Sequence, residues 1–187
     1  AFIVPQRFSG VAPHVVFPAE AAADTPERHQ AWENLDTVRS LLDASPSSLD
    51  RCYRDELPAA FPGNVGRVGL AIGTGFHTKR WPAIAWLELI RTLRDRAIEW
   101  TILCGIDERQ AAERLVAAAG VRREGRIVLG GDDVESFLGL VRSCDVVIGV
   151  DGGTTHLCAL AVPVVGLFGP SPFRRYAPVG RASRVVT

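Results

Sequence analysis

Two features common in other proteins are missing from this sequence, a net charge and a long apolar run. Lys+Arg and Asp+Glu both number 21 in the 187 residues, so the broad basic field of nucleic-acid-binding proteins is absent. The longest apolar run, Leu157 to Gly169, has 13 residues with Pro163 inside it, well short of the ~20 that a membrane-spanning helix requires. No nucleic-acid partner and no membrane-spanning segment are therefore expected.

Methionine is absent too, and cysteine and lysine are rare. The four cysteines show no CxxC or other metal-binding spacing, and three of them, Cys104, Cys144 and Cys158, lie in strongly apolar segments. We interpret them as reduced core residues. Because no charged segment followed by an apolar one opens the sequence, we expect a cytoplasmic protein. Lysine occurs once, at Lys79, among the 21 basic residues, which makes its position informative.

The composition, 47% hydrophobic and 22% charged, supports a buried core, and the chain falls into three regions. Residues 1–46 hold a weakly patterned start and then one amphipathic helix, roughly 26–44, which Asp24-Thr25-Pro26 begins. Residues 47–64 are rich in Ser, Pro and Gly near their two ends and are predicted to be a linker. Residues 65–187 form the main domain.

In the main domain, short β-rich runs alternate with amphipathic helical segments. Five strands are predicted, over Val68–Ile72, Trp100–Leu103, Ile127–Leu129, Val146–Val150 and Val164–Phe168. Helical patterns lie between them, around residues 86–93, 111–116, 134–141 and 154–160. Strands that lack apolar–polar alternation and are separated by helices predict a parallel sheet covered on both faces. The fold class expected is therefore α/β, a doubly wound, Rossmann-like sheet.

Ligands of such sheets bind beyond the carboxyl ends of the strands, where loops lead into helices. The loop after the fourth strand, residues 151–156, carries two glycines and two threonines at a helix start, which exposes backbone N–H groups suited to phosphate. His156 is placed to donate to a phosphate or ribose oxygen. A tight strand-to-helix turn without a ligand, with His156 as an ordinary packed or surface residue, explains the same pattern and stays an alternative.

The loop after the first strand, residues 73–82, is neither a P-loop nor a complete GxGxxG, since Thr78 stands where the third glycine belongs. Lys79 lies in this loop, where an ammonium can neutralise a leaving diphosphate; a solvated surface lysine is the alternative. Glu108 follows the second strand, as does the acidic residue that binds a ribose hydroxyl in doubly wound folds. It equally suits the first turn of a helix, whose dipole favours a carboxylate.

Four segments in this order resemble glycosyltransferase family 9, whose best-known members are the ADP-heptose:lipopolysaccharide heptosyltransferases. The segments are TKRWP at 78–82, GIDE at 105–108, VDGGTTHL at 150–157 and PVVGLFGP at 163–170. The similarity covers roughly residues 25–180. It implies a GT-B architecture of two Rossmann-like domains, in which residues 1–46 end the acceptor domain and residues 65–187 bind the nucleotide-sugar donor.

The resemblance also implies roles for individual residues. Lys79 would be the catalytic group that contacts the donor phosphates and assists departure of the diphosphate, and Glu108 would hold the ribose. The other donor-binding residues would be Thr74, Gly75 and Thr78 near the phosphates, Gly131 and Asp132 at the adenine, and Asp151, Gly152, Gly153, Thr154 and His156 around the diphosphate and sugar. The family usually has Asp-Thr-Gly in the loop after the fourth strand. In this chain Gly152 stands in place of the threonine, so one hydroxyl donor is missing.

The function implied is inverting transfer of a sugar, by analogy a heptose, from an ADP-sugar to a lipopolysaccharide-core or related glycan acceptor. No cofactor or metal is expected, because Asp132 and Asp133 are adjacent and not spaced as Asp-x-Asp. The protein would be cytoplasmic or peripheral to the inner membrane, where its acceptor lies. Most of the acceptor domain, with its acidic catalytic base, and the family's C-terminal helices would lie outside these 187 residues, so the chain alone is expected to be inactive.

Two alternatives belong to other functional classes. A non-catalytic nucleotide or sugar-nucleotide binding module would use the same loops to bind its ligand but would transfer no sugar. A nicotinamide-dependent oxidoreductase domain would use the same fold, but the incomplete GxGxxG disfavours it.

Overall fold

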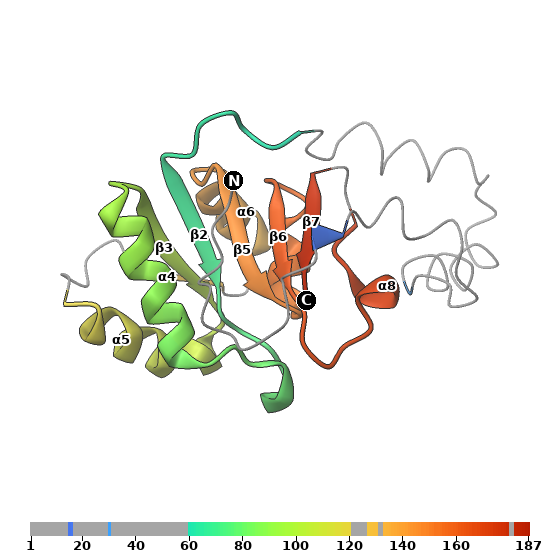
Figure 1. Ribbon diagram of the computed structural model, residues 1–187, viewed down its shortest axis with the longest axis horizontal. Helices are drawn as coiled ribbons and strands as arrows, with labels where there is room; N and C mark the ends of the chain where they lie inside the picture. The colour runs from blue at the N-terminus through green and yellow to red at the C-terminus, as the bar shows by residue number, and fades with distance from the viewer. Residues whose placement is uncertain (1–14, 17–29, 31–59, 121–126, 131–132, 180–181) are drawn as a thin grey trace.

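The computed structural model describes residues 15–16, 30, 60–120, 127–130, 133–179 and 182–187, and these build a sheet flanked by helices (Figure 1). The strands are β1 (Val15–Val16), β2 (Arg67–Ala71), β3 (Glu99–Cys104), β4 (Ile127–Leu129), β5 (Val146–Val150), β6 (Val164–Leu167) and β7 (Ser183–Val186). The helices are η1 (His77–Lys79), α4 (Ala83–Asp95), η2 (Ile106–Glu108), α5 (Arg109–Ala118), α6 (Val134–Val141), α7 (Gly153–Cys158) and α8 (Phe173–Tyr176).

The strands form one sheet in the order β1-β7-β6-β5-β2-β3-β4, parallel throughout except for the short edge strand β1, which pairs antiparallel with β7. The five predicted strands are confirmed to within about one residue at each end. Strand β7 and helix α8 were not predicted. From β2 the chain runs outward through β3 and β4, and it then returns to place β5 on the other side of β2. The chain therefore reverses its direction across the sheet between β2 and β5, which is the point where doubly wound folds bind ligands.

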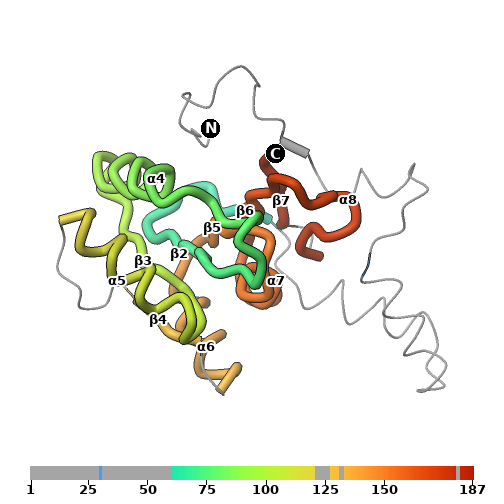
Figure 2. The backbone as a smooth tube through the Cα atoms, turned by 90° about the horizontal axis from the view of Figure 1, so that it is seen from below, coloured from blue at the N-terminus to red at the C-terminus, as the bar shows by residue number. Residues whose placement is uncertain are grey.

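Helices cover both faces of the sheet, which confirms the doubly wound α/β class. On one face α4 and α5 pack through Trp86, Ile90 and Val116 against the inward side chains of β2, β3 and β5. On the other face α6 and α7 pack through Phe137 and Cys158. The view in Figure 2 separates α4 and α7 to opposite sides of the strands. Strand β5 is buried along its whole length, as a central parallel strand must be.

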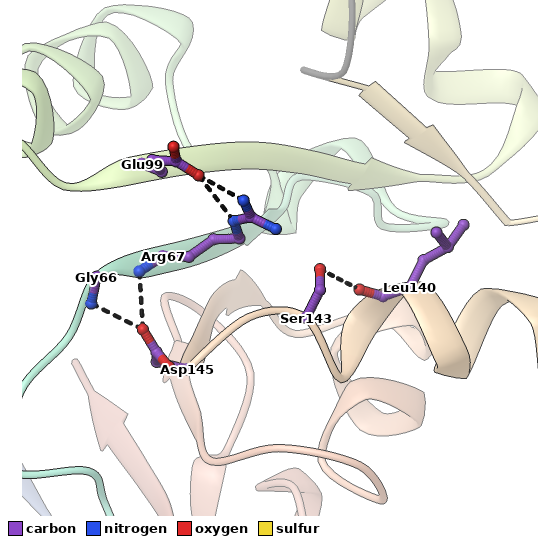
Figure 3. Close-up of polar contacts among 6 residues, drawn as sticks. All are labelled: Gly66, Arg67, Glu99, Leu140, Ser143 and Asp145. Atoms are coloured by element: carbon purple, nitrogen blue, oxygen red, sulfur yellow. Dashed lines mark hydrogen bonds and ion pairs between the residues drawn. The ribbon is translucent and has the colours of Figure 1, made fainter.

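The sheet is held at the amino ends of its strands by a charged network, at the edge opposite the loops of interest (Figure 3). Oδ2 of Asp145, just before β5, accepts the backbone N–H groups of Gly66 (2.7 Å) and Arg67 (2.8 Å). The Arg67 guanidinium donates through two nitrogens to one carboxylate oxygen of Glu99, at 2.6 and 3.0 Å. These contacts join β2, β3 and β5 at the edge of the sheet opposite the site loops.

The three described cysteines are core residues, as the sequence predicts. Cys104, Cys144 and Cys158 are buried and unpaired. Burial raises the pKa of Cys104 to about 11 and that of Cys158 to about 12, so both are protonated thiols at neutral pH. Cys52 lies outside the described residues.

The predicted domain boundaries stay predictions. Of the helix predicted over 26–44 only Gln30 is described, and it is helical; of the linker predicted over 47–64 only residues 60–64 are described. Among the described segments, no helix has the length and apolar character needed to cross a membrane.

Candidate functional site

The loops after β2 and β5 meet where these neighbouring strands end. Ala71 and Gly149 are partners in the parallel ladder, so both loops leave the sheet at the same edge. The Thr74 hydroxyl crosses between them and donates to the backbone carbonyl of Asp151 at 3.0 Å. Thr74 is 5% exposed, so this bond is shielded from water and ties the first loop to the start of the α7 loop.

A cluster of charged and polar groups surrounds the Asp151 carboxylate. The Lys79 ammonium lies 2.7 Å from Oδ2, and His156 Nε2 lies 3.7 Å from Oδ1. Ser171, in the loop after β6, is near enough to help lower the pKa of the same carboxylate. The Asp151 side chain is 7% exposed, whereas Lys79 is 25% and His156 is 41% exposed. One buried carboxylate thus lies among groups from three loops, and the side chains of Lys79 and His156 are more exposed than it is.

The Asp151 carboxylate is ionised at any ordinary pH. Its burial alone would raise the pKa, but the polar side chains of His156, Lys79 and Ser171 around it and the charge of Lys79 outweigh burial and lower the pKa from 3.8 to about 2. A carboxyl group that titrates this low is a poor proton donor or acceptor near neutrality. What the structure shows for it is the 2.7 Å ion pair with Lys79.

Glu108 lies at the same edge, beside the loop after β2. Its Oε2 accepts the backbone N–H of Gly105 at 3.0 Å, which closes a capping turn at the start of η2. A Cβ placed on Gly73 would come within 2.8 Å of the Glu108 carboxyl carbon, so the glycine makes room for this carboxylate. Glu108 therefore caps the start of a helix, as one of the two sequence interpretations predicts. This cap holds its carboxylate beside Gly73, in the loop after β2.

Gly73 is also in close contact on its other side. A Cβ on Gly152 would overlap the Gly73 carbonyl oxygen, so the loops after β2 and β5 touch backbone to backbone. Behind them, the Thr155 hydroxyl donates to the carbonyl of Val150 at 2.6 Å and packs where a Cβ of Gly149 would lie. The close approach of the two loops therefore requires glycine at these positions. This agrees with the alternative that the loop at 151–156 makes a tight strand-to-helix turn.

The structure brings most of the predicted site residues to this edge. Lys79, Thr74, Glu108, Asp151 and Gly152 are joined by the contacts above. Gly75 and Thr78 are exposed in the loop after β2, and Gly153, Thr154 and His156 belong to the first turns of α7. Gly131 and Asp132 lie outside the described residues.

No cluster of three metal-ligating side chains occurs within the part of the chain that the structure describes. Asp133, the described member of the adjacent Asp132–Asp133 pair, is the N-cap of α6. Its carboxylate accepts the backbone N–H groups of Glu135 and Ser136, both at 3.1 Å.

Three residues of the cluster were missed by the sequence reasoning. Ser171 lies in a loop that the strand pattern had placed at the correct edge, but nothing local shows that it reaches Asp151. Phe76 and Tyr176 flank Lys79, with ring centroids 5.3 and 5.7 Å from its Nζ. Tyr176 belongs to α8, whose four residues are too few to show a helical period.

Comparisons with known proteins agree on one family. The family model described as Glycosyltransferase family 9 (heptosyltransferase) matches residues 15–187. Lipopolysaccharide heptosyltransferase 1 of Pseudomonas aeruginosa is 36% identical over 125 residues, which are 63% of this chain and 32% of that protein.

Two solved E. coli structures are similar in fold. ADP-heptose lps heptosyltransferase II gives a TM-score of 0.53 at 21% identity, over 86% of this chain and 44% of that one. Heptosyltransferase WaaC with ADP gives a TM-score of 0.58 at 20% identity, over 86% of this chain and 51% of that one. The chain therefore spans a third to a half of the length of the relatives it matches.

Proposed function

The chain belongs to glycosyltransferase family 9, its fold matches about half of each solved heptosyltransferase chain, and we propose that its loops hold the nucleoside diphosphate of an ADP-sugar donor. The observation that carries the proposal is the Lys79–Asp151 contact of 2.7 Å. It holds the only lysine of the chain at the carboxyl edge of the sheet, between the two loops where the strand order reverses.

In the proposed reaction a hydroxyl of the acceptor attacks the anomeric carbon of the donor sugar from the face opposite the leaving group. The bond from that carbon to the diphosphate oxygen breaks, so the configuration inverts and ADP departs with the bonding electrons. Negative charge then grows on the diphosphate. The Lys79 ammonium and the first backbone N–H groups of α7, which have no carbonyl partner four residues earlier, are suited to stabilise that charge.

A metal ion is not required by this scheme, because the chain's own positive groups meet the leaving-group charge. The proton of the acceptor hydroxyl must pass to a base. With its pKa at about 2, Asp151 is unsuited to that role, so we assign the base to the acceptor domain expected from the family resemblance. Asp151 instead keeps Lys79 aimed at the diphosphate.

We assign the ribose to Glu108. Its Oε2 is occupied by the Gly105 N–H, but within the described ranges Oε1 receives no hydrogen bond. A carboxylate oxygen in that state is a suitable acceptor for a ribose hydroxyl. The other residues implied by the resemblance, Gly75, Thr78, Gly131, Asp132, Gly153, Thr154 and His156, complete the proposed donor site.

We further propose heptose as the sugar and a lipopolysaccharide-core or related glycan as the acceptor. The support is the similarity to proteins whose names include lipopolysaccharide heptosyltransferase 1 and ADP-heptose lps heptosyltransferase II. Contact with the inner membrane, if the whole protein makes it, would come through such an acceptor.

The experiment is calorimetric titration of the chain with ADP and, as comparators, UDP, GDP and NAD. The proposal predicts saturable ADP binding at least about tenfold tighter than that of the other three, a difference of about 1.4 kcal/mol. Tighter binding of UDP or GDP would keep the transferase class and reject the adenine nucleotide. Tighter binding of NAD would revive the oxidoreductase alternative.

A further inference from the structure

The Lys79 ammonium is in contact with more than its carboxylate partner. The ring of Phe76, from the same loop, lies 5.3 Å from Nζ, and the ring of Tyr176, from α8, lies 5.7 Å away. Both distances fall within the ~6 Å range of cation–π attraction. Lys79 therefore has an anion on one side and two aromatic rings around it, and its side chain is 25% exposed.

The Tyr176 ring is itself held in place. It packs with Phe173 against the small apolar cluster of Phe168, Ala177 and Val185. The Arg175 guanidinium lies 5.7 Å from the Tyr176 ring centroid. That guanidinium also donates to Gln30 Oε1 through Nε at 3.2 Å and through Nη2 at 2.8 Å, which ties α8 to Gln30.

Phe76 has no such packing role. The residue is 66% exposed, although burial of a phenylalanine ring is favourable. Its carbonyl accepts the backbone N–H of Lys79 at 3.0 Å, so the ring and the ammonium are fixed to the same turn. An exposed ring that adds little to the core, placed beside the one lysine of the chain, is better explained by the lysine than by stability.

We propose that Phe76 and Tyr176 are positioning residues that hold the Lys79 ammonium at the diphosphate of the donor. The proposal rests on the function proposed above and adds to it the groups that aim the lysine. A lysine side chain has four rotatable bonds and a strongly hydrated head, so a single ion pair leaves it many orientations. Two π-faces beside the ammonium reduce these orientations while leaving all three N–H donors available to Asp151 and to phosphate oxygens.

The test compares the affinities of ADP and AMP for each variant of the chain. ADP and AMP share the base and the ribose and differ in the β-phosphate, so the ratio of their affinities reports on the group that meets the diphosphate and is insensitive to a general loss of folded protein. Tyr176→Leu keeps apolar bulk without a π-face and should lower the ADP-to-AMP affinity ratio about three- to tenfold. Phe76→Leu, at an exposed site where folding is not at stake, should lower it about two- to threefold.

Two matched variants serve as controls. Tyr176→Phe keeps the π-face and should retain the wild-type ratio to within about twofold. Phe173→Leu removes a ring from the same helix and the same apolar cluster, but that ring is not among those beside Lys79, so its ratio should also stay within about twofold.

The outcomes separate this inference from the proposed function. If Lys79→Ala abolishes the preference for ADP while Tyr176→Leu and Phe76→Leu keep it, the positioning role is wrong and the donor site stands. If wild type shows no preference for ADP over AMP, or Lys79→Ala keeps the preference, the proposed function is wrong and the positioning role fails with it. A lower ratio in Phe173→Leu equal to that in Tyr176→Leu would also reject the inference, because general loosening of α8 would then explain both.

Discussion

Gly152 lies against the carbonyl oxygen of Gly73 so closely that no side chain fits between them. The resemblance to the family leads one to expect threonine at position 152, and the sequence alone interprets glycine there as the loss of a hydroxyl donor. The structure adds a steric reason for the glycine, because a Cβ would force apart the loops that carry Lys79 and Asp151. Glycine at position 152 thus has two consequences: the loop lacks a hydroxyl donor, and the two loops can pack closely.

Gly152→Ala should lower both stability and nucleotide binding. The added Cβ must displace backbone, which costs about 1–3 kcal/mol as overpacking does elsewhere, and a chain of this size then loses roughly 3–10 °C of melting temperature. ADP affinity should fall as the Lys79 loop moves away. Thermal unfolding and ADP titration measure the two effects.

Gly153→Ala is the matched control for stability, since a Cβ on Gly153 meets nothing within 4 Å. Its melting temperature should stay within about 2 °C of wild type or rise slightly, because alanine favours a helix. Equal loss of stability in the two variants would show that the contact with Gly73 is not what constrains position 152.

Asp151 gives the chain a stability term that depends on pH. Its pKa is lowered from 3.8 to about 2 in the folded protein, so the unfolded chain binds a proton first as the pH falls. The stabilisation is fully present above about pH 5, is lost progressively between about pH 4 and pH 2, and amounts to about 2 kcal/mol.

Urea unfolding of wild type and Asp151→Asn from pH 2 to pH 7 measures this term. The difference in free energy of unfolding between the two should be constant above pH 5 and shrink toward pH 2. A difference that is as large at pH 2 as at pH 6 would mean that the Asp151 charge does not stabilise the fold.

Glu108→Gln should separate the two roles that the sequence leaves open for Glu108. The amide oxygen of glutamine can still accept the Gly105 N–H, so the capping turn and the melting temperature should be kept. A neutral amide is a weaker acceptor for a ribose hydroxyl than a carboxylate, so ADP affinity should fall about three- to tenfold.

Glu108→Ala is the companion variant, and it should lose both the cap and the affinity. The cap is worth about 1 kcal/mol, which the melting temperature of the alanine variant reports. If glutamine binds ADP as well as glutamate does, Glu108 is a helix-start residue alone.

The sequence predicts the central sheet well, because its parallel strands are buried on both faces and appear as short continuous apolar runs. Strand β7 was missed since Arg184 lies within its four residues, and α8 was missed since four residues show no period. At the site, the lone Lys79 and the glycine-rich loop at 151–156 give local signals. The contacts of Ser171 and Tyr176 with this cluster give none, because the fold of the chain after β6 brings these residues to Asp151 and Lys79.

The most direct test is calorimetric titration with ADP of wild type, Lys79→Ala and Arg80→Ala. Both substitutions remove one positive charge from neighbouring residues of one loop, but in the structure Lys79 is the one bonded to Asp151. ADP should bind about tenfold or more weakly to Lys79→Ala and within about threefold of wild type to Arg80→Ala. Equal loss of ADP affinity in the two variants would mean that Lys79 contributes only its positive charge and not its position. Unchanged ADP binding in Lys79→Ala would contradict the placement of Lys79 at the donor diphosphate.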